Sequence, residues 1–143
     1  MKLVIDTNII ISALIREGIT RKMILFPGIK LFTSEITFKE IEKHKEIIIA
    51  KSRLTKQEIN QILDVLSKKI KTVPESRWLE YYNQAADIIG KKDPKDVPFM
   101  AVAFSITADG IWSNDKDFEI QSDFKVWKTI ELAEEFGFID RKN

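Results

Sequence analysis

Short apolar runs alternate with longer amphipathic segments along the 143-residue chain. The short runs are almost continuously apolar, which is typical of strands that are buried on both faces of a parallel sheet. Turn-forming or polar residues bound each run, as expected for strands. We therefore predict strands at residues 2–6, 30–33, 71–73, 110–113 and 125–128.

Helical spacing and capping residues fill the intervals between these runs. Thr7 or Asn8 could cap the first helix, and Thr37-x-x-Glu40 has the spacing of a capping box. Thr55 begins a second capping box, before apolar residues at helical spacing. Helices are predicted over 9–15 and 21–26, from residue 34 or 37, from 55, over 76–89, from the Asp93-Pro94 pair, and from Thr129 to a stop at Gly137.

Strands that alternate with helices predict an α/β fold with a mostly parallel central sheet and helices on both faces. The chain shows no internal repeat, low-complexity tract or dividing linker, so we predict a single domain over residues 1–143. In such sheets, ligands bind at the carboxyl ends of the strands. Residues that directly follow a predicted strand are therefore the first candidates for a functional site.

Composition removes several kinds of chemistry. The chain has no cysteine, which excludes disulfides, thiolate metal sites and cysteine nucleophiles. The chain has one histidine, His44, which lies on a charged helix, so multi-histidine zinc sites are excluded. A Ser-His-Asp triad would have to use His44, and no nucleophile-elbow motif accompanies it. A metal site here must use oxygen ligands, which suit Mg²⁺ or Mn²⁺.

Charge is unevenly distributed although the net charge is only +1. Residues 1–71 carry 14 basic and 8 acidic side chains, whereas residues 72–143 carry 9 and 14. A basic half beside an acidic half fits nucleic acid near a carboxylate site, but solvated helix faces would give the same pattern. No apolar stretch reaches membrane-span length, and the first run lacks a secretory pattern, so we expect a cytoplasmic protein without a membrane partner.

Carboxylates occur where the fold itself does not need them. Asp6 ends the first strand, Glu40 lies in the helix after the second, Asp96 lies in a first helical turn, and Asp115 and Asp117 follow the strand "GIWS". Each has a structural explanation when taken alone: a helix cap, a capping box, a favourable helix-dipole contact or a turn.

Their joint placement favours a metal site. Gathered carboxylates repel one another and raise each other's pKa, which a divalent cation would relieve. Mg²⁺ or Mn²⁺ lowers the pKa of bound water and neutralises phosphoryl oxygens, so hydrolysis of a phosphodiester is the natural use of such a site.

At these residues the sequence resembles PIN-domain ribonucleases, and among them the toxins of VapBC toxin–antitoxin systems. The matching segments are "LVIDTNIIISAL" at the start, "SEITFKEIEK" at 34–43 and "KDPKDVPFMAVAFSITADGIWSNDKDF" at 92–118. The resemblance spans nearly the whole chain and implies an α/β/α sandwich that cleaves single-stranded RNA with a divalent metal. Asn114 departs from it, since relatives often carry Gly or Arg there.

The resemblance also implies roles for individual residues. Asp6, Glu40, Asp96 and Asp115 match the catalytic acidic quartet, and Asp6, Asp96 and Asp115 match its metal ligands. The supporting positions are matched by Asn8, Ser113 and Asp117. An antitoxin that covers the acidic crevice would be the partner of such a toxin. The alternative is a non-catalytic PIN-like module that binds RNA or protein, in which we would expect carboxylates to be lost.

Apolar residues outside the motifs predict packing and contacts. Trp112 and Trp127 are expected in the core. Trp78 and Tyr82 share a helix face, which core burial, base stacking or a dimer contact would each explain. The run "EIIIAK" is more apolar than a solvent-facing helix requires. We predict a homodimer from this run and from the helix of Trp78 and Tyr82.

Overall fold

Five parallel strands form the centre of the molecule. The computed structural model describes residues 1–90 and 93–141, so Lys92, which opens the third motif segment, lies outside the described residues. The strand order is β3-β2-β1-β4-β5, with every pairing parallel. The bounds are β1 (Lys2–Ile5), β2 (Lys30–Ser34), β3 (Ile70–Val73), β4 (Gly110–Trp112) and β5 (Lys125–Trp127).

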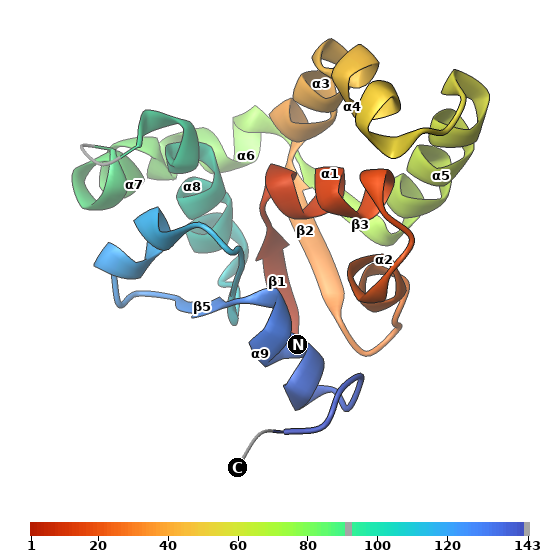
Figure 1. Ribbon diagram of the computed structural model, residues 1–143. Coiled ribbons are helices and arrows are strands. Elements are labelled where there is room, and N and C mark those ends of the chain that lie inside the picture. Colours follow the sequence, from red (N-terminus) through yellow and green to blue (C-terminus); the bar gives the residue numbers. More distant parts are fainter. Residues whose placement is uncertain (91–92, 142–143) are drawn as a thin grey trace.

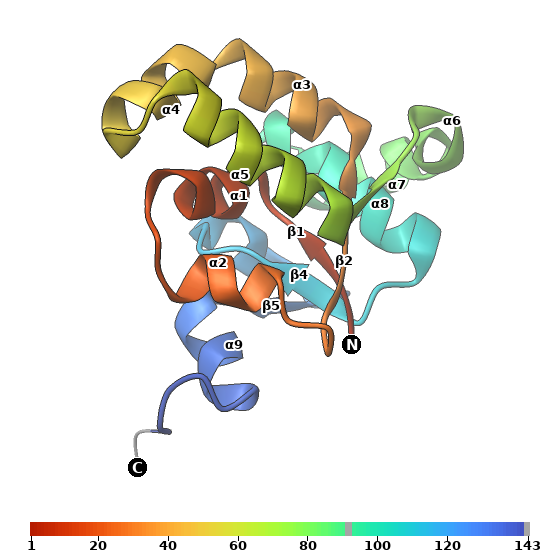
Figure 2. The ribbon, with the colours of Figure 1, turned by 90° about the vertical axis from the view of Figure 1, so that its right-hand side faces the viewer.

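Helices connect these strands and cover both faces of the sheet (Figures 1 and 2). The described α-helices are α1 (Thr7–Ile15), α2 (Ile19–Ile24), α3 (Glu35–Lys43), α4 (Lys45–Ser52), α5 (Lys56–Lys69), α6 (Glu75–Trp78), α7 (Tyr82–Ile89), α8 (Val97–Ile106) and α9 (Thr129–Glu135). Short 3-10 helices are η1 (Leu79–Tyr81), η2 (Pro94–Asp96) and η3 (Lys116–Ile120). None of these helices is both long and apolar enough to span a membrane.

Two hydrophobic cores, one on each face of the sheet, make the molecule an α/β/α sandwich. Successive side chains of a strand point to opposite faces. Leu3 and Ile5 accordingly pack with residues of α1, α2, α5 and α9, whereas Val4 packs with residues of α7 and α8. Trp112 and Trp127 are buried in the core that contains Leu3 and Ile5, as predicted.

The helix starts follow the sequence-based expectation in part. Asp6, rather than Thr7 or Asn8, caps α1. Ser34, one of the two starts predicted for the next long helix, caps α3 by accepting a hydrogen bond from the backbone of Ile36 at 3.2 Å, so the alternative Thr37-x-x-Glu40 box does not form. The capping box that begins at Thr55 is confirmed.

The predicted box at Thr37 fails because this side chain faces inward. Its hydroxyl lies 3.1 Å from that of Thr7 and 2.9 Å from that of Thr33, which donates to the Ile5 carbonyl at 3.2 Å. Buried hydroxyls need such partners, and here they join α1 and α3 to the ends of β1 and β2.

Two further expectations, one for residues 76–89 and one for the start of the last helix, are corrected. The predicted helix over 76–89 is divided into α6, η1 and α7. Lys128, rather than Thr129, is the residue before α9, and the Thr129 hydroxyl instead accepts a hydrogen bond from Trp112 Nε1 at 3.0 Å. His44 is exposed, and it lies between α3 and α4 rather than within one charged helix.

Strand order determines where a ligand can enter. β1 lies between β2 and β4, so the connections that leave β1 and β4 go to opposite sides of the sheet. Such a switch point opens a crevice at the carboxyl ends of the strands. The residues that directly follow β1 and β4 are Asp6 and Ser113.

Candidate metal centre

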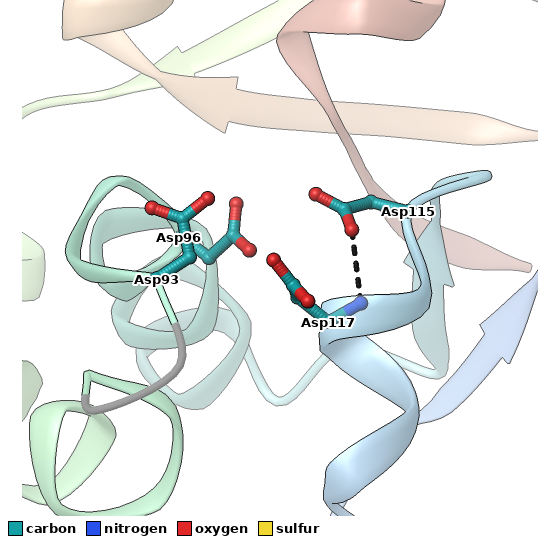
Figure 3. A group of neighbouring side chains, drawn as sticks. All are labelled: Asp93, Asp96, Asp115 and Asp117. Atoms are coloured by element: carbon teal, nitrogen blue, oxygen red, sulfur yellow. Dashed lines mark hydrogen bonds between the residues drawn. The ribbon is translucent and has the colours of Figure 1, made fainter.

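Four carboxylates meet beside this crevice (Figure 3). Asp93, Asp96, Asp115 and Asp117 each offer an oxygen, and these four atoms lie within 4.8 Å of one another. Asp93 caps η2 and Asp96 is its last residue, directly before α8. The other two follow β4 at the start of η3. Two segments that are distant in sequence therefore supply two carboxylates each.

Local structure turns the first pair toward the second. Asp93 caps η2 by accepting a hydrogen bond from the Lys95 backbone at 3.0 Å, and the Asp96 backbone donates to the Asp93 carbonyl at 3.1 Å. Pro94 suits the first position of this turn because its missing N–H has no helical partner to lose. Asp96 is left only 5% exposed, and its Oδ2 is buried without a hydrogen-bond partner among the described residues.

Backbone hydrogen bonds likewise fix the second pair. Ser113 continues the sheet beyond β4 by donating from its backbone to the Trp127 carbonyl at 3.1 Å. The Asp115 backbone donates to Ser113 Oγ at 3.0 Å, and the Asp117 backbone donates to Asp115 Oδ1 at 2.9 Å. This succession holds both carboxylates on a short, ordered turn at the edge of the crevice.

Asp6 adjoins the group through Ser113 rather than belonging to it. Its backbone donates to the Trp112 carbonyl at 3.1 Å, which ties the end of β1 to β4. Its Oδ2 accepts a hydrogen bond from Ser113 Oγ at 2.7 Å, and its Oδ1 accepts from the Asn8 backbone at 3.4 Å. Asp6, Asn8 and Asp115 line one pocket of about 290 Å³.

Burial and mutual repulsion disfavour the ionised forms of both buried carboxylates. Loss of solvent, followed by repulsion from Asp93, Asp115, Asp6 and Asp117, raises the pKa of Asp96 to about 7. Burial also raises the pKa of Asp6, with a smaller contribution from Asp115. The hydrogen bond from Ser113 opposes that rise.

The donor set fits a divalent cation. It consists of carboxylate oxygens, which are the ligands that Mg²⁺ and Mn²⁺ prefer. An unpartnered buried oxygen costs free energy unless something pairs with it. Asp96 Oδ2 is such an atom, and its carboxylate lies in a group with three others. A bound cation would provide that partner and offset the repulsion.

The candidates from the sequence are not all brought together. Asp96, Asp115 and Asp117 meet in the group of four, while Asp6, Asn8 and Ser113 lie beside it. Glu40 is exposed on α3 and is not part of the acidic group found among the described residues.

Sequence reasoning missed Asp93 as a candidate ligand. Its position before Pro94 identified it only as a helix start. The signal that was available is the spacing Asp93-x-x-Asp96, since a single tight turn brings residues three apart close together.

A comparison with protein-family models gives one match that covers most of the chain. The model described as "PIN domain" matches residues 4–137. The match includes both acidic pairs and Asp6. Comparison with curated proteins finds no match to the chain.

Proposed function

This chain belongs to the PIN-domain family, and from that premise we propose that it is an endoribonuclease that hydrolyses RNA phosphodiester bonds with Mg²⁺ or Mn²⁺. The observation that supports this most is the buried, unpartnered oxygen of Asp96 within a group of four carboxylates. A fold maintains such a repulsive group at a cost, and cation binding accounts for that cost.

The roles proposed for individual residues follow the resemblance to PIN-domain ribonucleases, and Asp93 is added because it lies in the group of four. In this proposal Asp6, Asp96 and Asp115 hold the ion, Asp93 and Asp117 add negative charge beside it, and Glu40 acts from α3 on the water. When bound, the ion would make a coordinated water more acidic and neutralise the charge that develops on the phosphate. Ser113 holds Asp6 and the Asp115 backbone with the same hydroxyl, so it fixes the separation of two ligands.

Calorimetric titration with Mn²⁺ tests the metal site without relying on activity. We expect wild type to bind and Asp96→Asn to lose binding, because the variant keeps the side-chain size and removes the anionic ligand. Asp123→Asn is the matched control, since Asp123 is exposed and lies outside the acidic group. Equal Mn²⁺ binding by all three proteins would contradict the proposed site.

Cleavage of a single-stranded oligoribonucleotide in Mn²⁺ then tests the activity. Wild type and Asp123→Asn should cut it, whereas Asp96→Asn and a reaction with a chelator should not. Oligonucleotide binding without any cleavage by wild type would instead favour the non-catalytic PIN-like module.

We also propose that the nuclease is the toxin of a toxin–antitoxin pair, with residues 1–143 as one cytoplasmic PIN domain. The support is the resemblance of the three motif segments to VapBC toxins. This proposal predicts a small reading frame beside its gene. Expression of the chain alone should arrest growth, and co-expression of that neighbour's product should restore it. Growth that is unaffected by the chain would point to a housekeeping nuclease.

A homodimer is the remaining proposal about partners. Ile47 on α4 is 56% exposed, and Leu79 and Tyr82 are 52% and 37% exposed. Trp78 is only 2% exposed, so it adds no surface to such an interface. Sedimentation velocity should show a dimer at micromolar concentration and a monomer for the interface variant Ile47→Glu. A monomeric wild type would overturn this proposal.

A further inference from the structure

A largely apolar pocket of about 560 Å³ lies beside the candidate metal centre. Its volume is within the range of small-ligand sites. Ile19 from α2 and Ile130, Ala133 and Ile139 from α9 and the segment after it form its apolar wall. Two cations, Lys116 and Lys128, also line it. Ile130 is 51% exposed, so part of this wall faces solvent.

The pocket adjoins the acidic crevice. Asn114 lines both this pocket and the smaller one that contains Asp6 and Asp115. Asn114 is held in place because its side chain accepts a hydrogen bond from the Thr129 backbone at 2.9 Å. A ligand that extends from the carboxylates past Asn114 would therefore reach the apolar pocket.

The two lysines of the pocket complement the charge of a nucleic-acid backbone. Lys116 forms no ion pair with any residue in the part of the chain that the structure describes. Lys128 Nζ lies 3.4 Å from Glu119 Oε1, but both side chains are 46% exposed, and such exposed pairs contribute little. Both ammonium groups are therefore available to an anion that lies at the edge of the pocket.

We propose that this pocket binds one nucleobase of the substrate strand, next to the phosphodiester that is cut; this inference rests on the proposed nuclease function. The isoleucine side chains would contact the faces of the base, and Lys116 and Lys128 would contact the phosphates that flank it. A flat apolar group linked to anions on either side matches a pocket with an apolar wall and two cations.

Oligoribonucleotides with one abasic position test the base contact directly. Metal-free buffer prevents cleavage, and fluorescence anisotropy then gives the affinity for the intact strand and for strands with the abasic position moved step by step. Wild type should bind one of the abasic strands about fivefold to tenfold more weakly than the intact strand, as expected for a lost apolar contact of this size.

Ile130→Glu should remove that discrimination, so that this variant binds the abasic and intact strands with equal affinity. Val65→Glu is the matched control, because Val65 is 49% exposed on α5 and does not line this pocket. The control should discriminate as wild type does. If Ile130→Glu discriminates as well as the control, the proposed base site is overturned.

Salt dependence tests the two lysines. Lys116→Gln and Lys128→Gln should each reduce the slope of log affinity against log salt by about 0.7, the value for one phosphate contact with a single strand. Lys71→Gln, an exposed control on β3, should leave the slope unchanged. Equal slopes for all three variants and wild type would overturn the phosphate contacts.

Failure of the base site and failure of the nuclease proposal give different results. If wild type binds and cuts RNA but never discriminates an abasic strand, only the base-site proposal fails. If wild type neither binds nor cuts any strand, with or without Mn²⁺, both proposals fail. If Ile130→Glu alters only the sedimentation coefficient, the pocket is a protein interface and the base site is rejected.

Discussion

The two buried carboxylates, Asp6 at the end of β1 and Asp96 at the start of α8, are the same chemical group in different surroundings. They are 4% and 5% exposed. Both oxygens of Asp6 accept hydrogen bonds, from Ser113 Oγ and from the Asn8 backbone. Asp96 Oδ2 has no partner among the described residues, and the Asp96 carboxylate lies in a group with three others.

This difference separates two roles within one site. The protein itself donates a hydrogen bond to each oxygen of Asp6, so that carboxylate can be positioned before any ligand binds. Asp96 lacks that satisfaction, and burial and repulsion raise its pKa to about 7. Binding of a cation should therefore change the protonation of Asp96 more than that of Asp6.

The largest expected effect comes from Asp115, which contributes to the group of four and also lines the pocket of Asp6. Asp115→Asn should lower RNA cleavage by at least about a hundredfold, since loss of groups that merely support a metal ligand already costs tenfold to a hundredfold. The metal-free protein should be as stable as wild type or more so, because repulsion is relieved. Cleavage assays and urea denaturation measure the two effects. Full cleavage with lost stability would make Asp115 a structural turn residue.

The pH dependence of stability without metal is the next largest effect. The folded-state pKa of Asp96 is about 7, against a usual value of 3.8, so between these values the folded protein holds a proton that the unfolded chain releases. Stability should therefore fall as pH rises from about 4 to about 7, by up to about 4 kcal/mol. Urea denaturation at several pH values should show this fall, and Mn²⁺ should reverse it near neutral pH.

Asp96→Asn provides the control for that pH dependence. The variant cannot ionise at this position, so the decline above pH 4 should become shallower, with the contribution of Asp6, whose pKa burial also raises, left. If its stability declines as steeply as that of wild type, another group titrates. The distinction between Asp96 and Asp6 would then have to be abandoned.

Ser113→Ala tests the satisfied side of the comparison. The change removes the donor to Asp6 and the acceptor for the Asp115 backbone, so we expect a stability loss of about 2 kcal/mol. Affinity for Mn²⁺ should fall about tenfold or more, as is usual for groups that orient metal ligands. Ser105→Ala is the control, because among the described residues Ser105 Oγ donates only to the Val102 carbonyl within α8. Equal Mn²⁺ affinities for the two variants would show that Asp6 does not need Ser113.

The sheet was more predictable from sequence than the site. Buried strands are almost continuously apolar, so each strand was located within a residue or two and the fold class followed. Cap identity was less predictable, because Thr37 could satisfy its hydroxyl either at a helix start or in the core. Only tertiary packing against Thr7 and Thr33 decides between the two.

Part of the acidic group was also beyond sequence reasoning. Placement at the ends of β1 and β4 identified Asp6 and Asp115, since strand ends have a fixed location in a parallel sheet. Asp93 has the same local signal as an ordinary cap before proline. Its additional proximity to Asp117 depends on how the start of α8 packs against η3, which spacing along the chain does not specify.

Substitution of Glu40 tests whether the site includes a residue of α3 in addition to Asp6 and Asp96. Its expected effect on Mn²⁺ affinity is the smallest of these predictions. The Glu40 side chain is exposed on α3 and lies outside the acidic group. Glu40→Gln should change Mn²⁺ affinity by less than about threefold and lower cleavage by about tenfold, as expected for a group that only orients the reacting water. Glu42→Gln on the same helix is the control, since in the described part of the chain Glu42 pairs only with Lys45, at 2.8 Å. Loss of Mn²⁺ binding in Glu40→Gln would place Glu40 among the ligands. Cleavage equal to that of Glu42→Gln would remove it from the mechanism, and the carboxylates that follow β1, open α8 and follow β4 would then account for the site.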